Sequence, residues 1–587
     1  MSKLHFFLFI GIFLSCSLSG QPAFDDDLGR RFLDPTATTH FEFPESLNRR
    51  ATITTPPELP VRSMAEWEEL EAITITWAKY KSTLAEIVHH AQQECKVYIN
   101  CESKAEVKAD LDFLQVEYGP NVIFLENQVF NSVWIRDYGP NCAYLNNVDS
   151  LIFVDWVYNR VERPDDDVLP SAIAEQIQVP LYETSEGNFH LTATGGNFMS
   201  DGMGSAFSSR LIIDENQDKE EKEIDQVMQE FLGINSYTKF EMLDFDSIHH
   251  IDMHMKLLDE ERFIFGEYPE GEGDHDIIEA NIEYLLATKK NAFGEPYEVI
   301  RIPMPPDFSE QYPSNLGNAD FRTYTNALFI NKMILVPTYQ TLYDTTALRI
   351  WRETMPGYNV VGIRSNELIG AYGAIHCVTK EIGVRDPLRI VYQKIKDQAN
   401  SQSTGYNLEA IIQHKSGIDK ASLFYRSNGE VNYREIEMEF IDFQKDLYSA
   451  TIPDFLDNGK VEYYVRATAN SGKTINRPMP APEAYYDFEI NERSNSVNTL
   501  GDVFLQAAFP NPSSGLVCIP LELDQAIDGQ LALYDIHGKL IQLIHDGTIE
   551  AGSSKIFAHV ADCAAGMYML RLTSMQDVYT QKLVVKK

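Results

Sequence analysis

Between residues 64 and 382, short apolar runs alternate with amphipathic stretches, and this alternation most constrains the fold of the chain. Runs of β-branched and aromatic residues predict strands, whereas apolar residues at helical spacing predict helices. The pattern predicts an α/β domain of about 320 residues, which is larger than a usual single core. The predicted strands are ITITWAKY, KVYINC, NVIFLE, LIFVDWVY, ALFINKMILVPTY and NVVGIR, and the predicted helices are residues 82–93, 220–232 and 276–288.

The helical pattern stops after Gly383, which sets the predicted end of the first domain (63–385). Residues 386–490 carry strand runs separated by turn signals such as SNGE and ANSGK, which is typical of an immunoglobulin-like β-sandwich. Residues 491–502 form a polar linker, and residues 503–587 have an all-β pattern again. The chain is therefore expected to contain one α/β domain followed by two all-β domains.

The first 20 residues have the pattern of a secretory signal peptide: Lys3, an apolar run over 4–14, and then small residues. Cleavage is expected near Ser19 or Gly20, and a lipoprotein anchor through Cys16 fits less well. Residues 21–62 are polar and proline-rich, as in an arm or propeptide. No apolar run is long enough to span a bilayer, so no transmembrane segment is expected.

The chain has 49 Lys and Arg residues against 87 Asp and Glu residues, a net charge of −38. Phosphate backbones and anionic lipids would repel such a chain, which argues against nucleic-acid and membrane-surface partners. The charge is compatible with a cationic substrate, and equally with a solvated surface that keeps an exported protein soluble.

Seven cysteines are too few for a disulfide scaffold in so long an exported chain. Cys95 and Cys101 lie in one predicted strand, about 20 Å apart, and cannot pair there. Cys518 and Cys563 lie in the last domain and could pair.

Cys377 follows a stretch of small residues in AYGAIHCVTKEI, which predicts a loop that delivers a cysteine to the start of a strand. A buried packing role is the common alternative for a lone cysteine. Upstream, WIRDYGP places Asp137 at a strand end before a Gly-Pro turn, where it could also cap the turn. TATGGNFMSDG contains Gly195 and Gly196, which allow close backbone approach or form a hairpin turn.

HHIDMHMKL is the most informative stretch if it is a strand, because His250, Asp252, His254 and Lys256 then share one face. A solvated edge strand is the alternative, and a metal site on the first three would lack the ligands to complete a tetrahedron. Asn326 enters a hydrophobic strand pair in TYTNALFINKMILVP, or caps the strand start.

Taken together, these motifs resemble the Porphyromonas-type peptidyl-arginine deiminase and agmatine deiminase family of the guanidino-group-modifying superfamily, over residues 63–382. The resemblance implies a five-bladed α/β propeller (pentein) and no cofactor. It implies that Cys377 is the nucleophile and His250 the general acid and base. It assigns substrate binding to Asp137, Asp252, Trp134, Gly196 and Asn197, and positioning to Asn326.

These roles suit the chemistry. Two carboxylates can bind a planar, cationic guanidinium through its N–H groups and fix its carbon for attack. The bound cation and a protonated histidine lower the pKa of a cysteine thiol, and the same histidine can protonate departing ammonia and then activate water.

Two departures bear on the substrate. Thr194 stands where agmatine deiminases usually have Glu, and Arg160 and Arg163 lie near where secreted peptidyl-arginine deiminases place carboxylate-binding arginines. The sequence therefore predicts a deiminase of peptidyl arginine, with Arg160 binding the α-carboxylate of a C-terminal arginine and Arg163 supporting it. The alternatives are solvated loop arginines, an agmatine deiminase producing N-carbamoylputrescine, a metal-dependent hydrolase and a catalytically silent binding protein.

AAFPNPSSG near residue 507 and the final GMYMLRLTS and KLVVKK runs resemble the sorting domain of the type IX secretion system of Bacteroidetes. The resemblance implies export to the cell surface or medium, with the secretion machinery and arginine-bearing peptides or proteins as partners. A plain adhesive β-sandwich is the alternative.

Overall fold

The computed structural model describes residues 53–314, 319–397, 405–454, 459–490, 503–505, 508–523, 526–574 and 578–587. The chain divides into two compact units at residue 491. The expected signal peptide, most of the expected arm and the expected linker lie outside the described residues. In the described ranges, no helix combines the length and the apolar character needed to cross a membrane.

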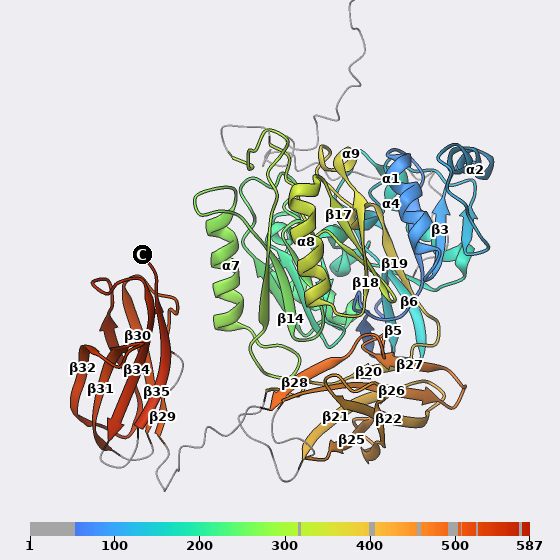
Figure 1. The fold of residues 1–587 in the computed structure, drawn as a ribbon. Helices are drawn as coiled ribbons and strands as arrows, with labels where there is room; N and C mark the ends of the chain where they lie inside the picture. The colour runs from blue at the N-terminus through green and yellow to red at the C-terminus, as the bar shows by residue number, and fades with distance from the viewer. Residues whose placement is uncertain are drawn as a thin grey trace, which may run out of the picture. The chain divides into compact units, whose positions relative to one another are not determined.

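The α/β part of the first unit is built around five sheets of three or four strands, counted over the residues that the structure describes (Figure 1). Each contains an antiparallel pair followed by a parallel pair, so the same strand pattern recurs five times. The sheets are β1 (Val61–Ser63), β5 (Asn141–Leu145), β6 (Ser150–Asp155) and β8 (Leu181–Glu183); β10 (Met199–Ser200), β11 (Ser205–Ser209) and β12 (Ser236–Phe240); β13 (Met255–Leu257), β14 (Arg262–Glu267) and β15 (Glu298–Pro303); β16 (Leu328–Ile330), β17 (Met333–Thr338) and β18 (Asn359–Arg364); and β19 (Lys380–Gly383), β2 (Leu70–Thr76), β3 (Lys96–Asn100) and β4 (Val122–Leu125).

The fifth sheet joins the two ends of the α/β part. β19 pairs antiparallel with β2, with Lys380 opposite Thr74, although more than 300 residues separate them in the sequence. The pairing seats the segment that carries Cys377 beside the start of the domain. A small sixth sheet joins β7 (Val157–Tyr158) to β9 (Thr192–Ala193).

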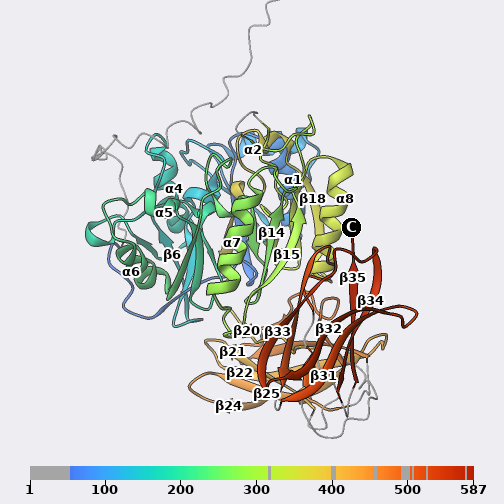
Figure 2. The same ribbon diagram turned by 90° about the vertical axis from the view of Figure 1, so that its left-hand side faces the viewer.

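Helices pack against these sheets, and Figures 1 and 2 show α7 and α8 on the outside, beside β14 and β18. Three of them match the predicted helices to within two residues, because their apolar positions have clear helical spacing. The helices are α1 (Lys81–Ala91), α2 (Lys104–Phe113), α3 (Ile135–Tyr138), α4 (Pro164–Ile177), α5 (Leu211–Asp214), α6 (Glu221–Leu232), α7 (His275–Thr288), α8 (Thr341–Thr354) and α9 (Asn366–Ile369).

Two local predictions are wrong. The stretch 249–257 is not one strand: it forms a 3₁₀ turn, η3 (Ile251–Met253), before the short strand β13, and His249 has a φ of 57°. All four titratable residues that we expected on one strand face are buried, so a solvated edge is also wrong. Asp137 does not end a strand but lies in the short helix α3.

The rest of the first unit is all-β, as predicted. Two antiparallel sheets face each other across a shared core that includes Leu408, Leu423 and Val465. One contains β20 (Arg389–Val391), β21 (Tyr406–Gln413), β25 (Leu447–Ile452) and β24 (Glu439–Asp442); the other contains β23 (Arg434–Glu437), β22 (Ile418–Ser427), β26 (Gly459–Ala469), β27 (Thr474–Arg477) and β28 (Tyr486–Ile490).

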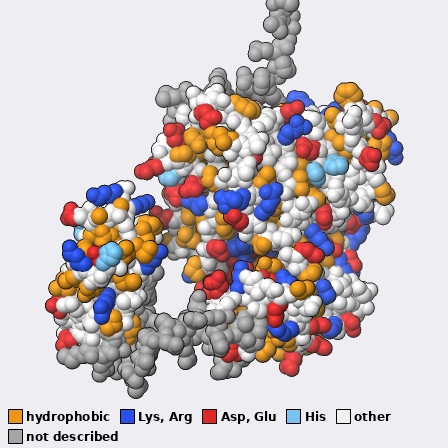
Figure 3. Space-filling model, viewed as in Figure 1, with side chains coloured by type: hydrophobic (Ala, Val, Ile, Leu, Met, Phe, Trp, Pro, Cys, Tyr) orange, Lys and Arg blue, Asp and Glu red, His pale blue; other side chains and the backbone are white. Residues whose placement is uncertain are grey.

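Ion pairs with buried carboxylates join this all-β part to the α/β part. Arg477 contacts Glu260 at 2.6 Å, and Lys394 contacts Asp259 at 2.7 Å. On the face drawn in Figure 3, acidic and basic side chains are interspersed rather than separated into large single-sign patches.

The second unit is all-β as well. Its antiparallel sheets enclose a core that includes Val517, Leu533 and Leu572. They contain β29 (Val503–Leu505), β30 (Leu516–Leu523) and β33 (Gly552–His559), and β32 (Leu540–Ile549), β31 (Ile527–Asp535), β34 (Gly566–Ser574) and β35 (Val578–Val585). Every cysteine that the structure describes is a free thiol, Cys518 and Cys563 included.

Candidate active site

Cys377 lies in a single 3₁₀ turn, η4 (His376–Val378), directly before β19. Its side chain is buried, and Asn326 donates a hydrogen bond from Nδ2 to the sulfur at 3.2 Å. The Oδ1 atom of Asn326 accepts the backbone N–H of His376 at 3.0 Å. Asn326 therefore holds both the thiol and the backbone of the turn that presents it.

The environment of Cys377 keeps it protonated in the empty site. Burial raises the pKa of the thiol well above its ordinary value, and the nearby carboxylates of Asp252 and Asp137 raise it further. The sulfur lies 3.8 Å from Oδ2 of Asp252. A cation entering between these groups would have the opposite effect on the pKa of the thiol.

Asp252 is a buried carboxylate with one oxygen engaged and one unsatisfied. Its Oδ2 contacts Nδ1 of His376 at 2.7 Å, whereas Oδ1 is buried without a hydrogen-bond partner. Burial raises the pKa of Asp252, but its hydrogen bond to His376 and the charges of His376, His250 and Arg136 lower that pKa overall. The group is therefore ionised at neutral pH and has one oxygen available for a donor.

His250 and Asp137 lie opposite one another against Gly196. Nδ1 of His250 is 3.6 Å from Oδ1 of Asp137, and neither ring nitrogen of His250 nor this oxygen has a hydrogen-bond partner. Buried polar atoms without partners are rare in folded proteins and call for an explanation. Carboxylate oxygens that accept and imidazole nitrogens that accept or donate are complementary to a ligand with several N–H groups.

A small pocket has Cys377 in its lining. Asp137 and both predicted carboxylate-binding arginines line it, together with apolar side chains. The lining residues are Trp134, Asp137, Arg160, Arg163, Ile248, Ala371, Tyr372 and Cys377. Both arginines are nearly buried, so the alternative of fully solvated loop arginines is wrong.

Five predicted residues are absent from this lining: His250, Asp252, Asn326, Gly196 and Asn197. Gly196 lies directly against the ring of His250. Asn197 is buried, and its Oδ1 accepts a hydrogen bond from the backbone N–H of Ser209 at 2.8 Å. Asn197 is outside the pocket lining and holds the turn η2 (Gly195–Asn197) against β11. Three lining residues, Ile248, Ala371 and Tyr372, were not predicted, because an isolated apolar or aromatic residue in a loop gives no sequence signal.

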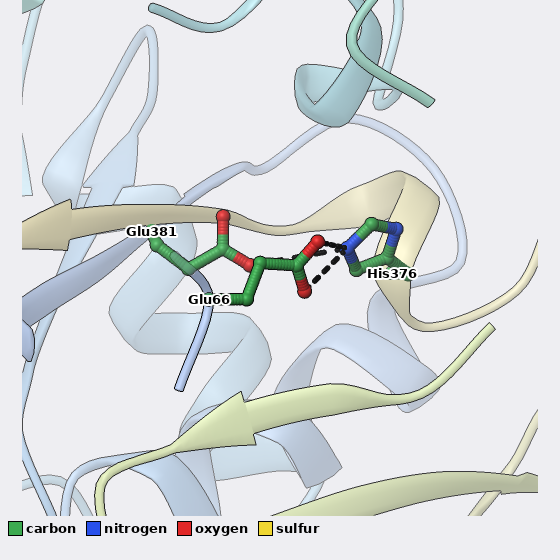
Figure 4. Close-up of side chains that lie close together, drawn as sticks. All are labelled: Glu66, His376 and Glu381. Atoms are coloured by element: carbon green, nitrogen blue, oxygen red, sulfur yellow. Dashed lines mark hydrogen bonds and ion pairs between the residues drawn. The ribbon is translucent and has the colours of Figure 1, made fainter. Parts of the chain in front are cut away.

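A buried network of charged residues contacts Asp252 through His376, and sequence reasoning missed it. Figure 4 shows three of its members, Glu66, His376 and Glu381. Nε2 of His376 is 3.1 Å from both carboxylate oxygens of Glu66. Arg136 donates two hydrogen bonds to Glu381, at 2.7 and 2.6 Å. Lys256 contacts Glu66. The available signal was a charged residue within an otherwise apolar run, as in AIHCV.

The carboxylates of Glu66 and Glu381 with His376 form the one group of three potential metal ligands found within the described ranges. However, Lys256 and Arg136 already neutralise these two carboxylates. The donor set therefore fits an ion-pair network rather than a metal site. Within the same ranges, His250, Asp252 and His254 do not gather as ligands, and burial lowers the pKa of His254 to about 4.

Comparison with known proteins assigns the chain to a family. Residues 62–382 match the model of the Porphyromonas-type peptidyl-arginine deiminases, and residues 507–586 match that of the secretion system C-terminal sorting domain. A putative agmatine deiminase of Marinomonas sp. is 22% identical over 371 residues, covering 58% of this chain and 100% of the relative. One of Vibrio parahaemolyticus is 21% identical over 279 residues, covering 43% and 76%.

Solved structures agree on the fold. The X-ray structure of a putative agmatine deiminase has a TM-score of 0.51 at 20% identity, covering 57% of this chain and 99% of that one. The agmatine deiminase of Enterococcus faecalis has a TM-score of 0.50 at 17% identity, covering 57% and 100%. The α/β part thus has the pentein-type fold of these deiminases.

The match to the sorting-domain model confirms the resemblance seen at the C-terminal end. It indicates that the type IX secretion system handles the chain and exports it to the cell surface or medium. The family model covers more than half of the chain, and it spans Cys377, His250, Asp252, Asp137 and Asn326. This chain therefore belongs to the Porphyromonas-type peptidyl-arginine deiminase family and is a deiminase, a hydrolase that acts on the C–N bonds of guanidino groups.

Proposed function

We propose that the protein is an exported protein-arginine deiminase that converts a C-terminal arginine of peptides to citrulline and ammonia. The observation that carries this proposal is that Arg160 and Arg163 line the same pocket as Cys377 and Asp137. Cys377 and Asp137 suit a guanidinium, and the two arginines suit a carboxylate. A substrate that uses the whole pocket must therefore carry both groups. A C-terminal arginine does, whereas agmatine has no carboxylate.

The first steps follow from the charges of the site. Asp137 and Oδ1 of Asp252 accept N–H groups of the guanidinium, which satisfies oxygens that otherwise have no partner. The bound cation lowers the pKa of Cys377, and the proton of its thiol passes to His250, which becomes the imidazolium of the next step. The thiolate then attacks the guanidinium carbon, forming an S–C bond and a tetrahedral intermediate.

His250 handles the protons. It donates a proton to the departing nitrogen, so that ammonia leaves and an S-alkylthiouronium remains on Cys377. The imidazole next takes a proton from water, which attacks the same carbon. The S–C bond breaks, citrulline is released, and the thiol regains its proton. Asn326 holds the sulfur throughout through its 3.2 Å hydrogen bond.

Agmatine is the second candidate substrate, and one observation favours it besides the names of the relatives. Glu215 is close enough to Arg160 and Asp137 for their charges to affect its pKa. Its Oε2 is buried without a hydrogen-bond partner. A carboxyl group in that position could accept the amine of agmatine. Thr194, which stands in place of a second carboxylate, weighs against this substrate.

Citrulline-type product formation on three substrates tests the proposal: agmatine, a peptide ending in arginine, and the same peptide with the arginine internal. The mature chain is assayed with EDTA present throughout, and Cys377→Ala is the blank. We expect turnover of the C-terminal arginine peptide, abolished in the blank. Turnover of agmatine alone would overturn the substrate assignment, and silence on all three would overturn the deiminase proposal itself.

Arg160→Gln sharpens this test. Its KM for the C-terminal peptide should rise about 10- to 100-fold, while kinetics on the internal arginine change little, because only the former offers a carboxylate. Arg210→Gln is the matched control, since that arginine is 45% exposed and contacts Glu241 at 3.9 Å. Equal losses on both peptides would remove Arg160 from carboxylate recognition.

Three further assignments belong to this proposal. The fivefold recurrence of one strand pattern supports a five-bladed propeller, and the two facing antiparallel sheets support an immunoglobulin-like sandwich. Residues 63–385, 386–490 and 503–587 would then be the deiminase, sandwich and sorting domains. A signal peptide would take the chain across the inner membrane, and the sorting domain across the outer one.

A further inference from the structure

We infer that His376 is a doubly protonated imidazolium that positions Asp252 for guanidinium binding. The inference deepens the proposed function, on which the role of Asp252 rests. His376 does not touch the substrate pocket, so it acts through Asp252 as a positioning residue.

The hydrogen-bond geometry requires two protons on the ring. Nδ1 lies 2.7 Å from Oδ2 of Asp252, and Nε2 lies 3.1 Å from both oxygens of Glu66. An ionised carboxylate can only accept, and a neutral imidazole has only one N–H group. The ring is fully buried, so water cannot substitute for the missing donor. Both contacts are satisfied only when the ring carries both protons.

The surrounding charges are of both signs. Lys256 contacts Glu66, and Arg136 forms a two-bond pair with Glu381. An imidazolium at 376 places a further cation against the buried carboxylates of Asp252 and Glu66, both of which it contacts. The charged and titratable groups that face His376 from the elements around it are Glu66, Arg136, His250, Asp252, Lys256, Cys377, Lys380 and Glu381.

Both carboxylates next to the ring respond to it. Burial by itself raises the pKa of Asp252 and of Glu66, but the charge and hydrogen bond of His376 bring each pKa below its ordinary value. Lys256 contributes further at Glu66. Of the groups next to Asp252, His376 has the largest lowering effect on its pKa.

The consequence for the reaction lies in the geometry of Asp252. His376 engages Oδ2, which turns Oδ1 into the oxygen that remains for the substrate. Without the imidazolium, burial would raise the pKa of Asp252, and the protonated carboxyl could no longer attract a guanidinium. Loss of His376 should therefore create a new requirement for high pH.

The first experiment detects the protons on the His376 ring and needs no substrate. In the full chain labelled with ¹⁵N-histidine, we expect the His376 ring to carry a proton on each of its two nitrogens. A His376 ring with a single attached proton would overturn the inference. Because this measurement uses the wild-type chain, it does not depend on whether a variant folds, and it is independent of the deiminase activity.

The second experiment tests whether His376 acts on the reaction through Asp252. We measure kcat/KM of wild type and His376→Gln from about pH 5.5 to 9, with His254→Gln as a control for loss of a buried but neutral histidine. The ratio of His376→Gln to wild type should fall by about tenfold per pH unit below the raised pKa of Asp252 and recover toward high pH. The ratio for His254→Gln should be flat.

A His376→Gln ratio that is low but independent of pH would indicate a merely structural role and overturn the inference. A persistent imidazolium in a wild-type chain that turns over none of the guanidino substrates would instead count against the proposed function. The two failures are therefore distinguishable.

Discussion

A Cβ atom added to Gly196 would lie 2.4 Å from Nδ1 of His250 and 3.0 Å from Oδ1 of Asp137. Only a residue without a side chain leaves room for the imidazole at this place. The Gly-Gly pair in TATGGNFMSDG thus serves the close approach of a buried side chain, and not a hairpin turn.

Gly196→Ala should displace His250 and lower kcat by about 100-fold or more, because proton transfer depends on ångström-scale placement of the base. The measurement is kcat on the best of the three guanidino substrates, with thermal unfolding recorded in parallel. Gly370→Ala, which precedes the Cys377 loop and has no atoms within 4 Å of the added Cβ, is the matched control. Unchanged kcat in Gly196→Ala would argue against His250 as the acid and base.

Alkylation of the empty enzyme should report the raised pKa of Cys377. Burial keeps the thiol protonated, so its rate of reaction with iodoacetamide should keep climbing through pH 9 without a plateau. Mass spectrometry of the modified peptide measures the rate, and Cys377→Ala gives the background from the other thiols. A plateau below pH 8 would mean that the resting site already holds a thiolate.

Arg477→Ala should destabilise the chain, because it leaves Glu260 buried without its partner. Side-chain exposures are 13% for Arg477 and 7% for Glu260, and burial raises the pKa of Glu260 even with Arg477 in place. Removing one member of a buried ion pair typically costs about 3 kcal/mol of unfolding free energy. Denaturant unfolding of the full chain measures the loss.

Arg434→Ala is the control for that experiment, because its pair with Glu430 is largely exposed and should contribute little. Replacing both buried partners, with Glu260→Leu and Arg477→Met, should recover much of the loss, since no uncompensated charge remains. A loss in Arg477→Ala no larger than in Arg434→Ala would refute a structural role for the pair.

Glu215 should make stability fall as the pH rises. Burial raises its pKa from 4.5 to about 8, so the folded chain retains a proton that the unfolded chain releases. Its unfavourable contribution to stability develops between those two values and is complete above pH 8. Glu215→Gln keeps an acceptor for Asn159, which donates to Oε1 at 2.5 Å, but removes the titration.

We therefore expect Glu215→Gln to gain about 4 kcal/mol over wild type between pH 5 and pH 9 in denaturant unfolding. Glu439→Gln, on the exposed face of β24, should follow the wild-type dependence. A parallel pH dependence in Glu215→Gln and wild type would show that Glu215 is ionised in the folded chain.

Much of the local structure could be predicted from the sequence, because the periods of helices and strands are local properties. The apolar positions of α6 recur at helical spacing, and its boundaries differ from the prediction by one residue. The helices α2, α4 and α8 escaped prediction; only two residues are buried in α2 and in α8, so each presents a weak apolar stripe. In α4, Pro170 interrupts the pattern.

The stretch around His250 shows where local reasoning fails. Alternation of polar and apolar residues predicted a strand with a polar face, but the polar side chains are all buried, and the chain turns in η3. Their partners are Asp137, His376 and Glu66, which lie far away in the sequence. No period within nine residues can report such partners.

The sequence by itself determined the family motifs and named the candidate reactive groups, because these are written in residue types and local spacing. Only the tertiary structure decided how the groups meet. Pairing of β19 with β2 brings Glu66 under His376, and the resulting charged network orients Asp252 beside Cys377. The physical reason is that buried charges are stable only in pairs, and the partners of a pair are chosen by the fold rather than by position along the chain.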